Sequence, residues 1–123
     1  RQGYANQLNH DHDQLQVWMA DVLSGRRNME ETLRNPDGRK LTSFIGMGQL
    51  KYIDGSHCPI PLEAGDRLVL MSDGIYNIVN EDRLAEILKR YPDVEQAAAV
   101  IERMVREGNH PHQDNYTAIV LGF

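Results

Sequence analysis

The 123-residue sequence is poor in several features that would have assigned it to a class at once. It has one cysteine, Cys58, so an internal disulfide is impossible. It has no apolar run near the roughly 20 residues of a membrane helix, and no signal peptide is visible. No lysine and arginine stripe alternates with aromatic residues, and the net charge is −5. These absences predict a reducing, cytoplasmic location, no membrane segment and no nucleic-acid partner.

The sequence also lacks an initiator methionine. It begins Arg1-Gln2-Gly3-Tyr4 without a helix or strand start signal, so we expect a fragment of a longer protein. Its length is about that of one domain, and its apolar and charged fractions are those of an ordinary globular protein. No internal repeat, low-complexity tract or interdomain linker is present.

Four segments have the apolar periodicity and the end signals of helices. Residues 12–24 repeat apolar side chains at i, i+3, i+4 and i+7, and residues 29–34 follow an Asn-x-x-Glu capping pattern. Two further helices are predicted between residues 80 and 91 and between residues 93 and 108, separated by a proline. The apolar faces of these helices are expected to form the core.

Five segments have strand character: residues 41–45, 49–53, 56–60, 67–72 and 116–121. An Asp-Gly pair between the second and third of them predicts a hairpin turn. The fourth is apolar on both faces, so we expect it to lie between two covering layers. Strands before and after a pair of helices predict an α+β fold with mainly antiparallel sheets, and so few strands suggest an incomplete sheet.

Two aspartates occupy equivalent places at the ends of the last two predicted strands. Asp73 follows one strand and Asp114 precedes the other, so antiparallel neighbours would bring both carboxylates together. Carboxylates that converge repel each other unless a proton or a cation lies between them. Oxygen ligands suit Mg²⁺ or Mn²⁺, which lower the pKa of a bound water and make it a nucleophile. The alternative is that Asp73 only caps the next segment or holds a turn.

Four segments, in this order, resemble motifs of one protein family. Residues 8–12 read LNHDH, residues 41–46 read LTSFIG, residues 68–77 read LVLMSDGIYN and residues 113–120 read QDNYTAIV. They are similar to motifs of the metal-dependent protein serine/threonine phosphatases (the type 2C family). The resemblance covers essentially all of residues 1–123, and it is to the C-terminal half of that family's catalytic domain.

This resemblance implies a fold and a set of site residues. The fold would be part of a four-layer α/β/β/α sandwich with a binuclear Mn²⁺ or Mg²⁺ centre. Asp73 and Asp114 would be metal ligands, together with an aspartate from the N-terminal half. Gly74 would leave room for the backbone, and Asn115 would position Asp114 or its strand. His112 is close enough to Asp114 in sequence to contact phosphate.

The resemblance also implies an activity. The intact protein would hydrolyse phosphoserine and phosphothreonine in proteins, with metal-activated water as the nucleophile and no catalytic side chain in this chain. Its partners would be phosphorylated protein substrates and a serine/threonine kinase that shares those targets. Residues 21–38 would form a flap beside the active site, typical of bacterial members. The family's N-terminal motifs are absent, so the fragment alone is expected to be inactive.

Two other functions stay open. One is a non-catalytic, phosphoprotein-binding or regulatory relative, and the other is a stress-response phosphatase that acts on anti-sigma-factor antagonists. Among single residues, we expect Asp11 to be a helix N-cap, the five histidines to be solvated loop residues rather than zinc ligands, and Cys58 to be packed. Asn115 has the alternative role of a turn former.

Overall fold

The computed structural model describes residues 3–108, 111 and 113–123, and the chain divides into two compact units. One unit consists of the described part of residues 1–6 together with residues 60–123. The other consists of residues 7–59. The longest helix described has 14 residues, and no helix in the described ranges combines the length and apolar character that a bilayer crossing demands.

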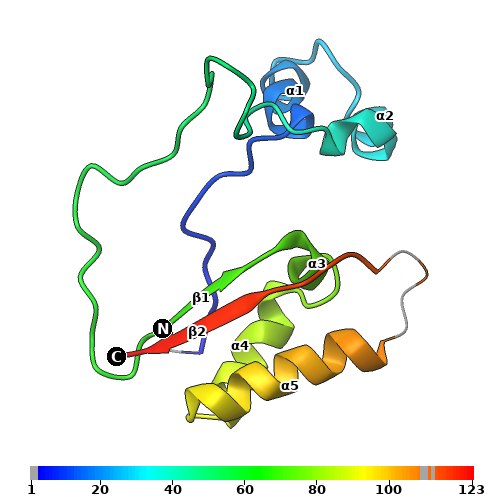
Figure 1. The fold of residues 1–123 in the computed structure, drawn as a ribbon. Coiled ribbons are helices and arrows are strands. Elements are labelled where there is room, and N and C mark those ends of the chain that lie inside the picture. Colours follow the sequence, from blue (N-terminus) through cyan, green and yellow to red (C-terminus); the bar gives the residue numbers. More distant parts are fainter. Residues whose placement is uncertain (1–2, 109–110, 112) are drawn as a thin grey trace. The chain divides into compact units, whose positions relative to one another are not determined.

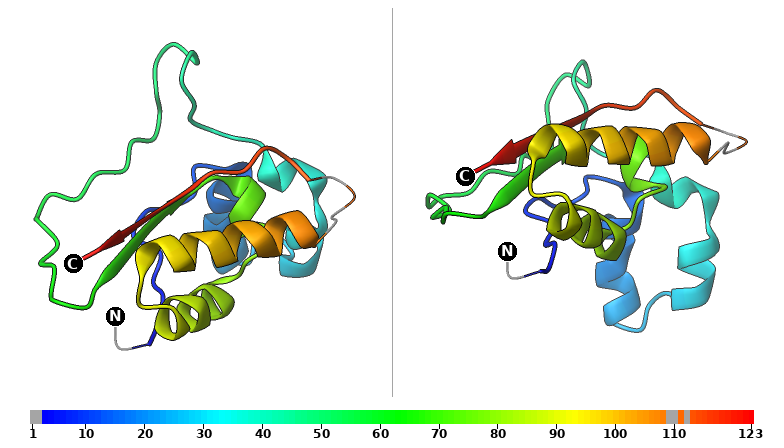
Figure 2. Two further views of the ribbon diagram at one scale, coloured as in Figure 1. Left: turned by 60° about the horizontal axis from the view of Figure 1, so that its bottom comes forward. Right: turned by 90° about the horizontal axis from the view of Figure 1, so that it is seen from below.

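The first unit is an antiparallel strand pair with helices against it. Its elements are β1 (Arg67–Met71), α3 (Asp73–Tyr76), α4 (Glu81–Arg90), α5 (Val94–Glu107) and β2 (Ala118–Gly122). Strands β1 and β2 pair antiparallel, as predicted, and they form the one sheet of the described residues. Figures 1 and 2 show α5 running alongside the strand pair with α4 next to α5. The α+β fold predicted from the sequence is confirmed.

The core of this unit lies between the helices and the inner face of the strand pair. Alternate strand residues point toward it, because successive side chains in a strand face opposite sides. The strand residues that pack on the core are Val69, Met71, Ala118 and Val120. The buried core residues are Ile75, Val79, Leu84, Ile87, Ala97, Ile101 and Val105.

Side-chain caps begin the two long helices at the predicted residues. Asn80 Oδ1 accepts from the backbone N–H of Arg83 at 2.9 Å, and Asp93 Oδ1 accepts from that of Gln96 at 2.8 Å. Each bond satisfies a backbone donor that a helix start leaves without a partner, which favours initiation at that residue. The local sequence signals were therefore sufficient to locate the starts of α4 and α5.

The outer face of the strand pair differs from the prediction. We expected β1 to be covered on both faces, but within this unit the helices cover one. Leu70 is 51% exposed and its cross-strand neighbour Ile119 is 52% exposed. Leu121 is also exposed, and it faces the half-buried Leu68. The outer face is thus apolar and open in this unit.

Because of this outer face, we expect the isolated 123-residue chain to self-associate. An exposed apolar sheet face favours contact with another apolar surface. We expect sedimentation velocity at micromolar concentration to show oligomers. A Leu70→Lys, Ile119→Glu double variant, which places opposite charges across the pair, should shift the chain toward monomer.

The matched control is Leu23→Lys, because Leu23 is 81% exposed on a helix of the other unit. This change should leave the association as it was. A compact monomer from the unmodified chain would contradict the prediction.

The helices of the second unit are short. Helix α1 (Gln14–Leu23) is followed by α2 (Met29–Arg34) and the 3₁₀ helix η1 (Pro36–Arg39). Asn28 caps α2 through the backbone N–H of Glu31, as predicted. The N-cap of α1 is Asp13 rather than Asp11, since Asp13 Oδ1 accepts from Gln16 N at 2.8 Å.

The strands predicted over residues 41–45, 49–53 and 56–60, with the hairpin between the last two, are wrong. The described residues of this region hold a single isolated bridge, between Asp13 and Leu41. A hairpin needs a third strand or a packed face to be stable. Here residues 48–59 are all exposed, so their apolar side chains have no surface to bury against. Cys58, predicted to be packed, is exposed as well.

Candidate active site

The candidate site begins where the strand pair ends. One residue beyond the last β1–β2 pair, the backbone N–H of Ser72 donates to the carbonyl of Thr117 at 2.9 Å. In return, the N–H of Thr117 donates to the side-chain Oγ of Ser72 at 3.0 Å instead of to a backbone carbonyl. A hydroxyl thus takes the place of the next ladder bond. The segments that carry Asp73 and Asp114 continue from this point.

Gly74 brings these two segments into direct contact. A Cβ atom at Gly74 would lie 2.5 Å from the backbone oxygen of Asn115 and 3.0 Å from Cβ of Tyr116. Gly74 is buried, and it lies in the first turn of α3. The residue after Asp73 therefore packs against the residue after Asp114, and only glycine leaves room for this approach.

The two aspartates have the same local geometry. Asp73 Oδ1 accepts from the N–H of Gly74 at 2.9 Å, and Asp114 Oδ1 accepts from the N–H of Asn115 at 2.7 Å. Both residues are exposed. The second oxygen of each carboxylate accepts no hydrogen bond from the described residues. Each aspartate is thus held by one backbone donor and presents its other oxygen to solvent.

Two residues that contact this site were not singled out from the sequence. Ser72 supplies the hydroxyl that closes the strand pair. Gln113 donates through Nε2 to the carbonyl of Gly74 at 3.2 Å and to that of Asp114 at 2.8 Å. The signal that could have found them is position, because each stands directly before a predicted ligand.

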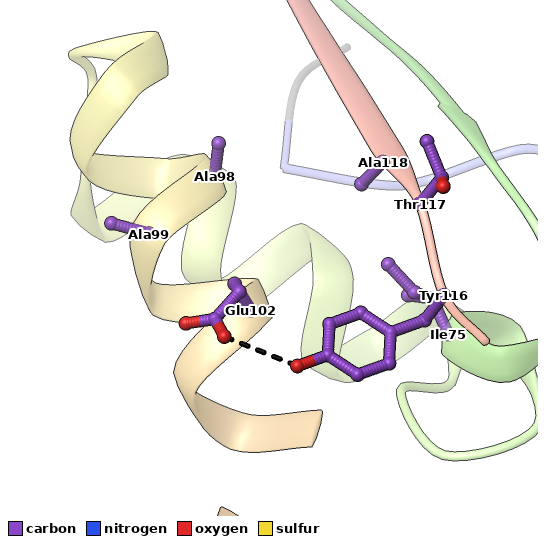
Figure 3. Close-up of a pocket in the computed structure, with 7 residues that line it drawn as sticks. All are labelled: Ile75, Ala98, Ala99, Glu102, Tyr116, Thr117 and Ala118. Carbon is purple, nitrogen blue, oxygen red and sulfur yellow. Dashed lines mark hydrogen bonds between the residues drawn. The ribbon is translucent and has the colours of Figure 1, made fainter. Parts of the chain in front are cut away.

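Tyr116 anchors the segment after Asp114 to α5. Its ring packs on the core, and its hydroxyl donates to Glu102 Oε1 at 3.1 Å (Figure 3). Burial of the hydroxyl raises the pKa of Tyr116 above its usual value, and the bond to Glu102 raises it further. The two residues border a cavity of about 410 Å³ between α5 and β2. The anchor ties the start of β2 to a long helix.

The donor set fits part of a metal centre. Asp73 and Asp114 carry carboxylate oxygens on adjacent segments, and oxygen is the ligand type that Mg²⁺ and Mn²⁺ prefer. No group of three or more histidine, cysteine, aspartate or glutamate side chains comes together among the described residues. The described residues thus offer two carboxylates to a cation, and further ligands would come from water, substrate or residues outside this set.

The histidines divide into described and undescribed ones. His10 Nδ1 lies 3.0 Å from Asp54 Oδ2, and its backbone N–H also donates to that carboxylate. This backbone bond, and secondarily the ring, lowers the pKa of Asp54. The ring of His12 lies 6.0 Å from that of Tyr52. The predictions for His110 and His112 concern positions outside the described residues.

The segment of residues 21–38 contains two arginines, and each contacts a side chain of its own unit. Arg26 forms an ion pair with Asp21 at 2.6 Å, and the guanidinium of Arg27 lies 4.0 Å from the ring centroid of Trp18. An exposed ion pair of this kind adds little stability, whereas the stacked arginine covers part of an aromatic face.

Comparison with known proteins identifies relatives of the chain. No protein-family model matches it. Curated proteins similar to it include the serine/threonine phosphatase stp of Listeria monocytogenes serotype 4b (strain F2365) and that of serovar 1/2a (strain EGD-e). Each is 25% identical over 115 residues, which are 94% of this chain and 43% of the relative.

A solved structure agrees with this result. The S. agalactiae serine/threonine phosphatase matches with a TM-score of 0.77 and 27% identity, over 100% of this chain and 48% of that one. The chain thus spans less than half the length of the relatives it matches. The relationship to serine/threonine phosphatases that the motifs predicted is confirmed.

Proposed function

We propose that the intact protein hydrolyses phosphoserine and phosphothreonine in proteins, with Mn²⁺ or Mg²⁺ held by Asp73 and Asp114. The observation that carries this proposal is the packing of Gly74 against Asn115, which sets the two aspartate-bearing segments side by side. The relatives support it, because the matched proteins are serine/threonine phosphatases.

The chemistry follows from the charges of the site. Two exposed carboxylates alone would repel a phosphate dianion, so Asp73 and Asp114 favour catalysis only with a cation between them and the substrate. When bound, the metal supplies a water of lowered pKa and positive charge for the phosphoryl oxygens. The backbone donors of Gly74 and Asn115 orient one oxygen of each carboxylate, and the other oxygen of each would be available to hold a cation. No covalent phosphoenzyme is required.

The proposal has several further parts. The remaining ligands of a binuclear centre would come from outside residues 1–123, and the chain alone would be inactive. His112 would contact phosphate, and residues 21–38 would act as a flap that influences substrate choice. The protein would act in the cytoplasm of a bacterium, opposite a serine/threonine kinase.

The test is hydrolysis of a phosphothreonine peptide by the intact protein with Mn²⁺, with Mg²⁺ and with EDTA. We expect turnover with either cation and at least about a hundredfold less with EDTA, because the cation supplies both the nucleophile and the charge. A phosphotyrosine peptide of the same sequence is the matched control and should be cleaved more slowly. Equal rates with and without EDTA would contradict the proposal.

A second candidate is the non-catalytic relative that binds phosphoproteins. The observation that favours it is the pair of carboxylates without a third ligating side chain in the described part of the chain. It predicts that the intact protein binds the phosphothreonine peptide but releases no phosphate at saturating Mn²⁺. The same assay therefore separates the two functions.

A further inference from the structure

We infer that Gln113 is a positioning residue, which holds the segments of Asp73 and Asp114 at a fixed separation. The inference rests on the proposed function. The Nε2 atom of Gln113 donates to the carbonyl of Gly74 at 3.2 Å and to that of Asp114 at 2.8 Å. A primary amide has two N–H donors, so a single nitrogen can serve both carbonyls. The neutral side chain of Gln113 thus joins Gly74, which follows Asp73, to Asp114.

The link lies where backbone pairing has ended. The strand ladder closes at Ser72 and Thr117, through a hydroxyl in place of a carbonyl. Beyond it, the contact of Gly74 with Asn115 limits how closely the segments approach, but a van der Waals contact does not prevent sliding. A hydrogen bond is directional, so the amide of Gln113 restricts sliding as well.

The acceptor of this bond is available because of the way α3 ends. The N–H of Ile78 donates to the carbonyl of Ile75 at 2.9 Å, three residues back, rather than to that of Gly74. A carbonyl in a short helix that has lost its helical donor needs another partner. Gln113 supplies that partner from a segment 39 residues further along the chain.

The expected consequence concerns cation affinity. Without a cation, the charges of Asp73 and Asp114 repel each other and favour separation of the segments. The amide of Gln113 opposes this separation and adds no charge of its own. Because the ligands are held before binding, the cation does not have to order them. Loss of the amide should therefore weaken binding of the metal more than binding of the phosphopeptide.

The test is Gln113→Met in the intact protein, which keeps an unbranched side chain of similar length but has no donor. Titration calorimetry with Mn²⁺ alone should show a Kd about tenfold higher than in the unmodified protein, the lower end of effects reported for residues behind a metal ligand. At saturating Mn²⁺, KM for the phosphothreonine peptide should stay within about twofold and kcat within about threefold.

The controls separate this inference from the proposed function. Gln96→Met changes a glutamine exposed on α5 and should leave the Mn²⁺ affinity as it was. Gln113→Ala is a second donor-free variant if Gln113→Met does not fold. An unchanged Mn²⁺ Kd in a folded Gln113 variant, or a rise in KM alone, would overturn the inference. An unmodified protein that binds no Mn²⁺ would instead overturn the proposed function.

Discussion

Asp73→Asn in the intact protein should lower Mn²⁺-dependent hydrolysis of a phosphothreonine peptide by at least about a hundredfold. Loss of a residue that only supports a metal ligand typically costs about 10- to 100-fold, and loss of the ligand itself should cost more. The amide keeps the size of the side chain and can still accept the N–H of Gly74. It removes the negative charge that a hard cation requires, so metal affinity and turnover should fall together while the fold stays intact. Activity at several Mn²⁺ concentrations and circular dichroism measure the two properties.

Asp114→Ala should have an effect of the same size, because Asp114 is the partner ligand in the proposal. The matched control is Asp82→Asn, which changes an exposed aspartate in the first turn of α4. Its loss should cost no more than about 1 kcal/mol of stability through the helix dipole and should leave turnover as it was. Full activity of either the Asp73 or the Asp114 variant would show that the metal site has been assigned wrongly.

Gly74→Ala should destabilise the intact protein by about 1–3 kcal/mol, the range for a methyl group forced into a packed site. Helix propensity alone predicts the opposite sign, because alanine is favoured over glycine in a helix by about 1 kcal/mol. Sterics should prevail because the new Cβ would lie 2.5 Å from the carbonyl oxygen of Asn115, and a backbone atom cannot rotate away. Urea denaturation measures the change.

Separation of the two segments in this variant should also weaken Mn²⁺ binding. Gly55→Ala is the matched control, because a Cβ at Gly55 meets nothing within 4 Å and its backbone does not have a positive φ. Its free energy of unfolding should change by less than about 1 kcal/mol. A Gly74→Ala protein as stable as the control would mean that the segments move apart without cost.

The helices show which parts of the fold local sequence determines. Caps at Asn28, Asn80 and Asp93 predicted three helix starts, and each cap bond is present. These signals act within three or four residues, so they do not depend on the rest of the molecule. The N-cap of α1 was misplaced by two residues, since Asp11 and Asp13 are equally good caps and only the structure distinguishes them.

The strands show where local sequence is insufficient. Of the predicted residues 67–72, Arg67–Met71 form β1, because β2 and the helices supply this segment with hydrogen bonds and a core. Residues 49–53 and 56–60 have similar strand character, but in the described chain they pair with no strand and all of them are exposed. Strand formation depends on partners elsewhere, and a propensity cannot state whether those partners are present.

By itself, the sequence determined the long helices, the place of the main antiparallel strand and the relationship to serine/threonine phosphatases, because each is written in short, contiguous segments. Only the tertiary structure decided which residues meet across the chain. It set Gly74 against Asn115 and directed the amide of Gln113 to the carbonyl of Gly74. It also left Leu70 and Ile119 exposed on the outer face. Contacts between residues some 40 positions apart arise from strand pairing and packing, which no local pattern encodes.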